Sequence, residues 1–310
     1  MKAARIHTFG SPEVLVVEDI PTPSPASGEV LIRVNAAGVG PWDAWIREHK
    51  SQVSVTLPIA LGSDLAGTIA QLGSGVSGFQ PGEPVYGVTN PLFVGAYAQL
   101  AVAKAGMIAR KPATLTDVEA ASVPVVAVTA WQMLFEYAKV KSGQTVLIQG
   151  AGGNVGAYAV QLAKSAGLRA IATASAQDVA YVKSLGADQV YDYRATPFET
   201  QVSGVDAVLD LVGGETRRRS FEVLKPGGSL VSAVSPIPPE EIPAGIHATF
   251  FLVEVTTARL NALTQLFEQH HLSTRVGAVL PLDQVRAAHE MLAGAPHPRG
   301  KIVLRVNHLA

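Results

Sequence analysis

The fold is decided by residues 145–156, TVLIQGAGGNVG, in which an apolar, β-branched run ends in a cluster of glycines. A helical pattern follows at once and stops near Gly167. Strand, glycine-rich turn and helix in this order form the pyrophosphate-binding opening of a dinucleotide fold, because the first free N–H groups and the dipole of the helix attract phosphate. We therefore predict nucleotide binding here, against the alternative of an ordinary strand-to-helix turn with excess glycine.

The glycines of this turn have distinct expected roles. Gly153 lets the backbone approach the ligand, and Gly156 lets the helix pack tightly on the strand. Ala151 stands at the first position of the hexapeptide, where the usual pattern has Gly. The remaining expected phosphate contacts are Gly152, Asn154 and Val155.

Length and composition narrow the class of protein. The 310 residues suffice for two domains, and 48% hydrophobic against 16% charged residues predicts a large core. The 24 Lys and Arg nearly balance the 25 Asp and Glu, which leaves no electrostatic footprint for nucleic acid. No apolar run reaches the about 18 residues of a membrane span, and the start lacks a signal peptide. There is no cysteine. We expect a cytoplasmic protein whose chemistry comes from a bound cofactor or from oxygen and nitrogen side chains.

The order of elements predicts two different domains. Short strands punctuated by Gly and Pro indicate a barrel-like β domain at the start, with strands at 14–20, 29–34, 65–72, 84–88 and 96–103. A βα alternation follows, with strands at 145–149, 169–173, 188–191, 205–211, 229–234 and 247–253. Six strands joined by crossovers of this length predict an α/β, doubly wound parallel sheet. A final helix and strand, 282–292 and 301–306, are expected to return to the first domain.

Several short motifs together resemble the medium-chain dehydrogenase/reductase superfamily, and within it the zinc-free quinone oxidoreductase branch. They are AAGVGPWD (36–43), LGSDLAG (61–67), PGEPVYG (81–87), AVTAW (127–131), the glycine turn, SLGAD (184–188) and LKPGG (224–228). The resemblance implies a GroES-like β-barrel catalytic domain (1–118), a Rossmann domain (119–257) and a C-terminal return (258–310). It also implies reduction of quinones or α,β-unsaturated carbonyls by NADPH in the cleft between the domains.

The residues at the zinc positions do not suit zinc. The zinc-dependent branch carries a Cys after the Gly-Val motif and a His-Glu pair after the next Gly. This chain has Gly40 or Pro41 at the first position and Ser63-Asp64 at the second. Neither offers the thiolate or imidazole that zinc prefers, and a four-cysteine structural site cannot exist without cysteine. We expect no metal.

The end of the second Rossmann strand favours NADPH over NADH. An acidic residue there would hold the ribose hydroxyls of NAD and repel a 2′-phosphate, and residues 173–177 contain none. Asp178 is the nearest acid that could hold the ribose hydroxyls instead, but its spacing from Ser175 predicts a helix cap. Related sequences often place Arg or Lys here and this chain has Gln177, so Arg194, after Tyr193, is the candidate for the missing charge; its alternative is a surface arginine. The arginines at 217–219 are expected on an exposed helix face.

With no metal, the reaction must rely on hydride from the cofactor and on an already electrophilic substrate. The resemblance places candidate catalytic residues at Trp42, Asp43 and Tyr86. Each has a structural alternative: helix core for Trp42, a helix cap for Asp43 and a barrel residue for Tyr86. The further cofactor contacts implied by the family positions are Thr129, Ser175, Tyr193, Arg194, Val234, Ser235, Phe251, Val253 and Lys301.

Two departures from the family leave the catalytic details open. Relatives often have Asn where this chain has Gly40, and some enoyl reductases carry a proton-donating Tyr after this loop, where only His49 offers a substitute. A protein that binds NADPH with little turnover, in a structural or regulatory role, is therefore the rival hypothesis. An enoyl reductase acting on thioesters is a third, although the neutral charge balance predicts no basic entrance for the carrier group.

The sixth strand predicts a homodimer. Residues 247–253, HATFFLV, lie at the expected edge of the sheet, are apolar and contain no proline or lysine to prevent pairing. Relatives cover this edge with the same strand of a second subunit about a two-fold axis.

Overall fold

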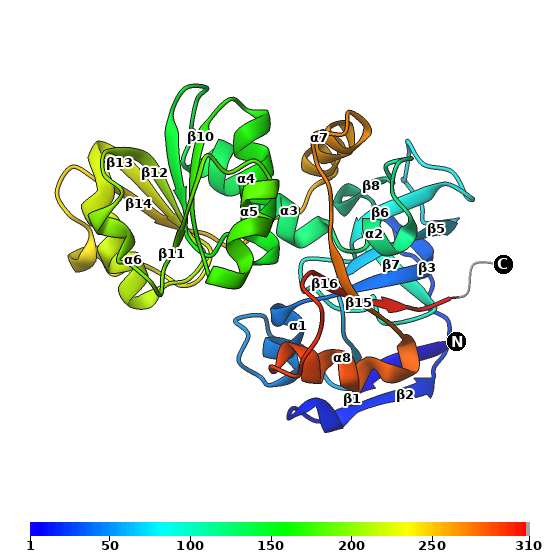
Figure 1. The fold of residues 1–310 in the computed structure, drawn as a ribbon. Helices are drawn as coiled ribbons and strands as arrows, with labels where there is room; N and C mark the ends of the chain where they lie inside the picture. Colours follow the sequence, from blue (N-terminus) through cyan, green and yellow to red (C-terminus); the bar gives the residue numbers. More distant parts are fainter. Residues whose placement is uncertain (308–310) are drawn as a thin grey trace. The chain divides into compact units, whose positions relative to one another are not determined.

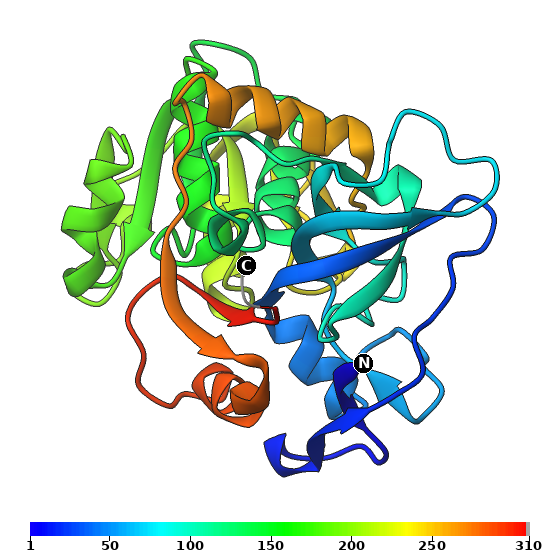
Figure 2. The ribbon, with the colours of Figure 1, turned by 90° about the vertical axis from the view of Figure 1, so that its right-hand side faces the viewer.

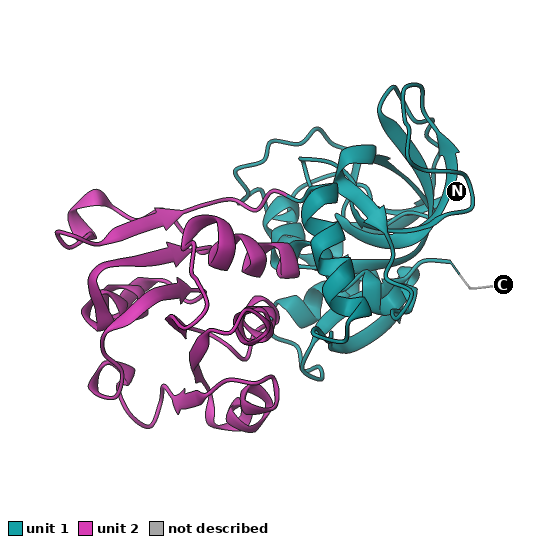
Figure 3. Ribbon diagram, turned by 90° about the horizontal axis from the view of Figure 1, so that it is seen from above, with its two compact units in different colours: residues 1–125, 255–310 teal, residues 126–254 magenta. Residues whose placement is uncertain are grey.

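A computed structural model describes residues 1–307, which form two compact units. Unit 1 comprises residues 1–125 and the chain from 255 onwards, and unit 2 comprises residues 126–254 (Figure 3). The chain therefore leaves unit 1 once and returns to it once. The units divide at Val125/Val126 and Glu254/Val255, whereas the boundaries predicted from the sequence follow residues 118 and 257.

Unit 1 is built on a seven-stranded sheet. Its strands lie in the order β15 (Val276–Pro281), β16 (Lys301–Arg305), β3 (Glu29–Val39), β5 (Asp64–Leu72), β6 (Pro84–Val88) and β8 (Ile108–Arg110), and β7 (Leu100–Lys104) also pairs with β3. A smaller sheet joins β2 (Leu15–Asp19), β1 (Lys2–Ile6) and β4 (Ile59–Ala60). Strand β16 pairs with β3 in antiparallel orientation. The C-terminal segment is therefore part of the same sheet as a strand from near the N-terminus (Figure 2).

Apolar side chains explain why these strands form. Val30, Ile32 and Val34 of β3 share one face and are fully buried, and Leu31 on the other face is buried as well, so this strand lies inside the unit. The α-helices among the described residues of this unit are α1 (Pro41–Arg47), α2 (Asp117–Ala120), α7 (Thr257–Glu268) and α8 (Val285–Leu292). Helix α8 adds Val285 and Ala288 to the same core.

Unit 2 is a six-stranded, entirely parallel sheet with its connecting helices around it (Figure 1). The strands lie in the order β11 (Gln189–Asp192), β10 (Arg169–Ala174), β9 (Thr145–Ile148), β12 (Val205–Asp210), β13 (Leu224–Ser232) and β14 (His247–Phe250). The helices are α3 (Pro124–Trp131), which begins at the end of unit 1, α4 (Asn154–Ser165), α5 (Val179–Ser184) and α6 (Gly214–Ser220). The chain winds outwards from β9 in both directions, so the predicted doubly wound fold is confirmed, with its switch point beside β9.

Some element boundaries differ from those predicted. Strand β14 does lie at the edge of the sheet, but it ends at Phe250 rather than at 253. Helix α3 continues directly into one stretch of π-helix, Gln132–Tyr137. Strands β1, β4, β8 and β15 were not predicted. Within residues 1–307, no helix has both the length and the apolar character to cross a membrane.

Candidate active site

The glycine turn of unit 2 leads from β9 into α4 as predicted. Gly150 has φ 71°, a left-handed conformation that favours glycine, and Gly153 is the N-cap residue without a side-chain cap. The N–H groups of the first helical turn are thus left for a ligand. Asn154 and Gly153 are exposed, and Gly152 and Val155 are partly so. These residues fit a pyrophosphate group.

Gly156 is needed for a close approach within the turn. A Cβ atom at this residue would lie 2.5 Å from the carbonyl oxygen of Gly150 and 2.6 Å from Cα of Ala151. Both are backbone atoms that cannot give way separately. The start of α4 can therefore rest on the turn only because residue 156 has no side chain.

A network of buried side-chain hydrogen bonds holds the glycine turn in place. Thr173 Oγ1, on β10, donates to Gln149 Oε1 at 2.6 Å and accepts from the N–H of Gly150 at 3.3 Å. Gln149 Nε2 donates in turn to Ser220 Oγ at 3.1 Å. Sequence reasoning did not identify this network, which ties the strand before the turn to the neighbouring strand and to α6.

The positions predicted for the cap after β10 are confirmed, but its hydrogen bond is not. Ser175 is the N-cap residue of a 3-10 turn, residues 176–178, with Asp178 in its first turn; the Ser175 hydroxyl donates to Asp178 Oδ2 at 2.6 Å and makes no cap to the backbone. The Asp178 carboxylate also lies against the glycine turn, since Oδ2 is 2.9 Å from the position that a Cβ atom on Gly152 would take. A carboxylate beside the phosphate-binding turn is near the place where the ribose hydroxyls of a bound dinucleotide are expected.

Tyr193 and Arg194 follow β11 on the neighbouring segment. The Tyr193 side chain is 50% exposed, its N–H donates to the carbonyl of Ala174, and the Arg194 guanidinium lies 5.5 Å from its ring centroid. The hydrogen bond from the Tyr193 N–H to the Ala174 carbonyl joins the end of β11 to the end of β10, directly before Ser175. Arg194 is exposed, so its charge faces solvent.

Apolar side chains are exposed where the next strands end. Val212 and Val234 are 49% and 43% exposed and follow β12 and β13. Val212 lies 3.2 Å from a Cβ built on Gly150, and Val234 lies 3.0 Å from one built on Gly213, so both border turns at the carboxyl edge of the sheet. Parallel α/β sheets bind ligands at this edge. Val234 was predicted as a site residue and Val212 was not.

Asp210 organises this edge. Its Oδ1 accepts from the N–H groups of Val212 and Gly213 at 3.1 and 2.7 Å, and its Oδ2 accepts from Ser232 Oγ at 2.7 Å. The fully buried carboxylate thereby holds the turn after β12 to the end of β13. An acidic residue at the end of an apolar strand is the signal that could have identified it.

The arginine run was predicted on an exposed face, and this is wrong for Arg217. It is buried, donates from Nη1 to Ser235 Oγ at 3.0 Å and pairs with Glu241 at 3.2 Å. Ser235, predicted to bind the cofactor, is therefore engaged by α6. Arg218 is exposed as expected, and Arg219 is partly buried.

The other predicted contacts of unit 2 lie in two segments. Phe251 and Val253 follow β14 outside the strand, and the Phe251 ring packs on Tyr137 with 4.4 Å between centroids. Thr129 is buried within α3. The last predicted cofactor residue, Lys301, belongs to unit 1.

In unit 1, Trp42 brings several predicted residues together. Its Nε1 donates to Ser63 Oγ at 2.9 Å, and the ammonium group of Lys301 lies 4.2 Å from the ring centroid. A Cβ atom at Gly40 would lie only 2.3 Å from the indole. The ring therefore occupies the space beside residue 40 and reaches residue 63, the two positions where the zinc branch has its ligands. Trp42 is partly exposed and is not a core residue.

Asp43 and Asp64 lie buried in the same unit. Asp43 Oδ2 accepts from the N–H of Gly40 and from the Tyr97 hydroxyl, both at 2.8 Å, so the predicted cap is confirmed. Asp64 Oδ2 pairs with Lys301 Nζ at 3.3 Å. Burial raises the pKa of Asp43 to about 7 and raises that of Asp64, although the charge of Lys301 opposes both shifts.

Tyr86 is placed as a barrel residue. It is fully buried in β6, and its hydroxyl donates to the carbonyl of Leu260 in α7 at 2.8 Å. Burial raises its pKa further above the usual range. These contacts favour the structural alternative over a catalytic role. His49 is exposed and stacks on Phe9 with 4.3 Å between ring centroids.

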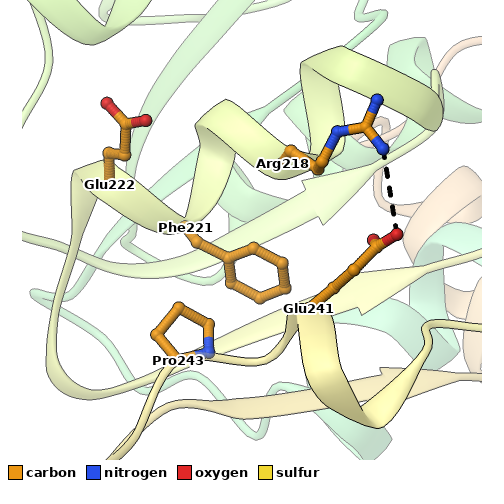
Figure 4. A pocket seen from close by; sticks show the side chains of 5 residues that line it. All are labelled: Arg218, Phe221, Glu222, Glu241 and Pro243. Carbon is orange, nitrogen blue, oxygen red and sulfur yellow. Dashed lines mark ion pairs between the residues drawn. The ribbon is translucent and has the colours of Figure 1, made fainter.

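A hollow of about 420 Å³ lies elsewhere in unit 2 (Figure 4). The Phe221 and Pro243 rings face it, and an Arg218–Glu241 ion pair of 3.8 Å stands at one end with Glu222 at the other. None of the predicted site residues lines it. It offers no group suited to hydride transfer, and we do not assign it to the reaction.

Comparison with known proteins places this geometry in a family. Residues 26–113 match the model of the alcohol dehydrogenase GroES-like domain, and residues 185–304 match that of zinc-binding dehydrogenase. The quinone oxidoreductase of Pongo abelii is 30% identical, over 98% of this chain and 97% of that protein. The chain belongs to the medium-chain dehydrogenase/reductase superfamily. Its place is in the quinone oxidoreductase-like branch of that superfamily.

Solved structures of superfamily members agree. The quinone oxidoreductase of Coxiella burnetii superposes with a TM-score of 0.91 at 34% identity, over 99% of both chains. A protein described as an NAD-dependent alcohol dehydrogenase gives a TM-score of 0.88 at 30% identity, over 99% of this chain and 100% of that one. The chain is thus an oxidoreductase of a superfamily whose Rossmann domains bind a nicotinamide cofactor.

The two groups implied by the superfamily fit this chain differently. The cradle of Gly152 and Gly153 at the start of α4 fits the pyrophosphate of a nicotinamide dinucleotide. Zinc does not fit: Gly40 has no donor atom, Ser63 accepts a hydrogen bond from Trp42, and in residues 1–307 no three His, Cys, Asp or Glu side chains are grouped as metal ligands.

Proposed function

We propose that this chain is a zinc-independent reductase that transfers hydride from NADPH to quinones or α,β-unsaturated carbonyl compounds. The main support for this proposal is the glycine turn of unit 2. Helix α4 starts in close contact with this turn, and the free N–H groups there suit the phosphates of a dinucleotide. Support for the substrate class comes from the names of the relatives and from the buried charges of unit 1. The rival hypothesis is a protein that binds NADPH with little turnover. It explains the glycine turn equally well but assigns no role to the buried charges of unit 1.

The residues of the chain have separable tasks in this reaction. When bound, the reduced nicotinamide supplies the hydride. The first turn of α4 holds the pyrophosphate, and the apolar edge formed by Val212 and Val234 offers a surface from which water is excluded. Trp42 presents an aromatic face backed by the Lys301 ammonium, which suits a flat, electron-poor substrate. A quinone or enone already accepts hydride, so no Lewis acid is required.

The proposal is tested with purified protein, NADPH and a panel of quinones, alkenals and enoyl thioesters. Loss of the absorbance of reduced nicotinamide with quinones or alkenals supports it. Turnover of thioesters alone would assign the enoyl reductase alternative. Tight NADPH binding without turnover on any substrate would assign the binding protein.

Activity is expected to be independent of metal. Elemental analysis should find no stoichiometric zinc, and a chelator should leave the rate unchanged, because the Trp42 ring fills the space that a metal ligand at residue 40 would need. The control is a zinc-dependent member of the superfamily treated in the same way. About one zinc ion per chain would contradict the zinc-independent assignment.

For the reductant we propose NADPH, because residues 173–177 carry no acid. One observation favours NADH as a second candidate: the Asp178 carboxylate against Gly152. Asp178→Asn is expected to tighten NADPH binding about tenfold relative to NADH, since it removes a like charge near the 2′-phosphate. Gln177→Arg should tighten it further by one charge-assisted hydrogen bond, about 1.5–3 kcal/mol.

Fluorescence titration with both nucleotides measures these preferences. Glu222→Gln, an exposed acid of the same unit, is the matched control and should change neither affinity. Tighter binding of NADPH by the unaltered protein supports the proposal. Tighter binding of NADH would contradict it and would assign Asp178 to the ribose hydroxyls.

We also propose that the protein is a homodimer. Strand β14 is a bare sheet edge with apolar residues, which needs a cover. Light scattering is expected to give twice the chain mass of 32.4 kDa, and Phe250→Glu should return it to the single-chain mass. Phe251 is unsuitable for this test because its ring packs on Tyr137. A single-chain mass for the unaltered protein would refute the dimer.

A further inference from the structure

Asp210 of unit 2 is a buried charge without a counter-charge. It ends β12 and is fully buried. Its hydrogen bonds are all accepted ones, from the N–H groups of Val212 and Gly213 and from the Ser232 hydroxyl, which is the pattern of an ionised carboxylate. Within the described part of the chain, Asp210 forms no ion pair with Lys, Arg or His. Buried charges in proteins are usually paired, so this one calls for an explanation.

The charged groups around this strand are already paired with one another. The buried Arg217 of α6 pairs with Glu241 at 3.2 Å, so its positive charge is balanced there. Asp206, the other acid of β12, forms an ion pair with Lys225. The acid near the amino end of the strand therefore has a cation, and Asp210, at the carboxyl end, has none.

The Asp210 carboxylate lies behind an exposed apolar surface. It fixes the N–H of Val212 directly, and Ser232 Oγ, which donates to it, accepts from the N–H of Val234 at 3.2 Å. The two valine side chains are 49% and 43% exposed, whereas Asp210 and Ser232 are fully buried. Val212 also borders Gly150 of the glycine turn, so this surface continues from the phosphate-binding turn along the carboxyl edge of the sheet. A ring that binds on the two valines is brought close to the buried carboxylate.

We propose that the charge of Asp210 stabilises the oxidised over the reduced form of the bound nicotinamide and so promotes the release of hydride. The inference rests on the proposed reductase function. The reduced ring is neutral, and loss of a hydride, one proton with two electrons, to the substrate leaves it with one positive charge. The Asp210 carboxylate is the counter-charge for that cation and stabilises the charge as it develops. Because Asp210 is fully buried, it is a positioning residue that acts through its charge and through the two turns it holds.

Three variants separate the charge of Asp210 from its structural role. Asp210→Asn removes the charge, keeps an oxygen for the N–H groups of Val212 and Gly213, and can donate from its amide to the Ser232 hydroxyl. Ser232→Ala keeps the charge but removes the side chain that joins the two turns. Asp206→Asn is the matched control, because it makes the same substitution in the same strand, about 13 Å further along it.

The readout is the ratio of the dissociation constants of NADP⁺ and NADPH, measured by calorimetry without substrate, or of NAD⁺ and NADH if these bind more tightly. In Asp210→Asn the constant for the oxidised form should rise about tenfold relative to that for the reduced form, because only the oxidised ring is charged. This change raises the reduction potential of the bound couple by about 30 mV. Ser232→Ala should weaken both forms together, and Asp206→Asn neither, so both variants should keep the ratio of the unaltered protein.

The outcomes distinguish this inference from the proposed function. An unchanged ratio in Asp210→Asn, or an equal shift in Asp206→Asn, overturns the inference even if the protein reduces quinones. If Asp210→Asn does not fold, Asp210→Ser, which is smaller and also neutral, provides the same comparison. A shifted ratio in a protein that turns over no quinone or enone would instead refute the proposed function, since the ratio is measured without substrate. Failure of the unaltered protein to bind either nucleotide would refute both.

Discussion

Lys301→Met is expected to lower the free energy of unfolding by about 3–5 kcal/mol at neutral pH. Lys301 is buried and is the ionic partner of the buried Asp64. Its charge also lowers the pKa of Asp43, so its removal leaves two carboxylates in the core without a counter-ion. The loss should far exceed that in Lys2→Met, the matched control, because the Lys2–Asp19 pair is exposed and such pairs contribute at most about 1 kcal/mol.

The effect should depend on pH in a defined direction. Burial already raises the pKa of both acids, and loss of Lys301 raises it further. A raised pKa means that the folded state prefers the protonated acid, so stability falls as the pH rises through it. Urea unfolding should therefore show a larger deficit in Lys301→Met at about pH 8 than at about pH 5.5. An equal deficit below about 1 kcal/mol at both pH values would show that the ion pair is not needed.

The nucleotide turn could be predicted from the sequence because its signals are local. An apolar strand, a glycine cluster and a helix follow one another within residues 145–165, and each sets its own backbone. The parallel sheet follows from the spacing of such units, since crossovers of this length join parallel strands. The cap at Asp43 was equally local, because it joins residues three apart.

The buried cluster of unit 1 could be predicted only in part. Trp42, Asp43 and Lys301 were named from family positions, and Asp64 was named only as a residue at a zinc position. Tyr97 was not named, because only the folded chain brings its segment to Asp43. The Tyr97–Asp43 hydrogen bond spans 54 residues, and no periodicity connects such groups. Asp178 shows the opposite difficulty. Its spacing from Ser175 correctly predicts an N-cap at Ser175, but it does not predict that the Asp178 carboxylate accepts from the Ser175 hydroxyl and lies against the glycine turn.

Gly156→Ala is expected to raise the dissociation constant for nicotinamide nucleotides by at least about tenfold and to destabilise the protein by about 1–3 kcal/mol. The new methyl group would meet the carbonyl oxygen of Gly150 at 2.5 Å and Cα of Ala151 at 2.6 Å. Neither backbone atom can rotate away, so α4 has to move off the turn. This movement displaces the N–H groups that are proposed to hold the pyrophosphate.

Gly153→Ala separates the effect on nucleotide binding from the effect on stability. A Cβ atom at this N-cap residue meets nothing closer than the Gly150 oxygen at 3.4 Å, and its φ of −79° suits alanine. The variant should lose less than about 1 kcal/mol of stability and still bind nucleotide poorly, because the methyl group stands where the backbone faces the phosphates. Gly106→Ala, with open space around its Cβ position, is the control for both measurements. If Gly156→Ala binds nucleotide as the unaltered protein does, the close approach of α4 to the turn is not what creates the phosphate site.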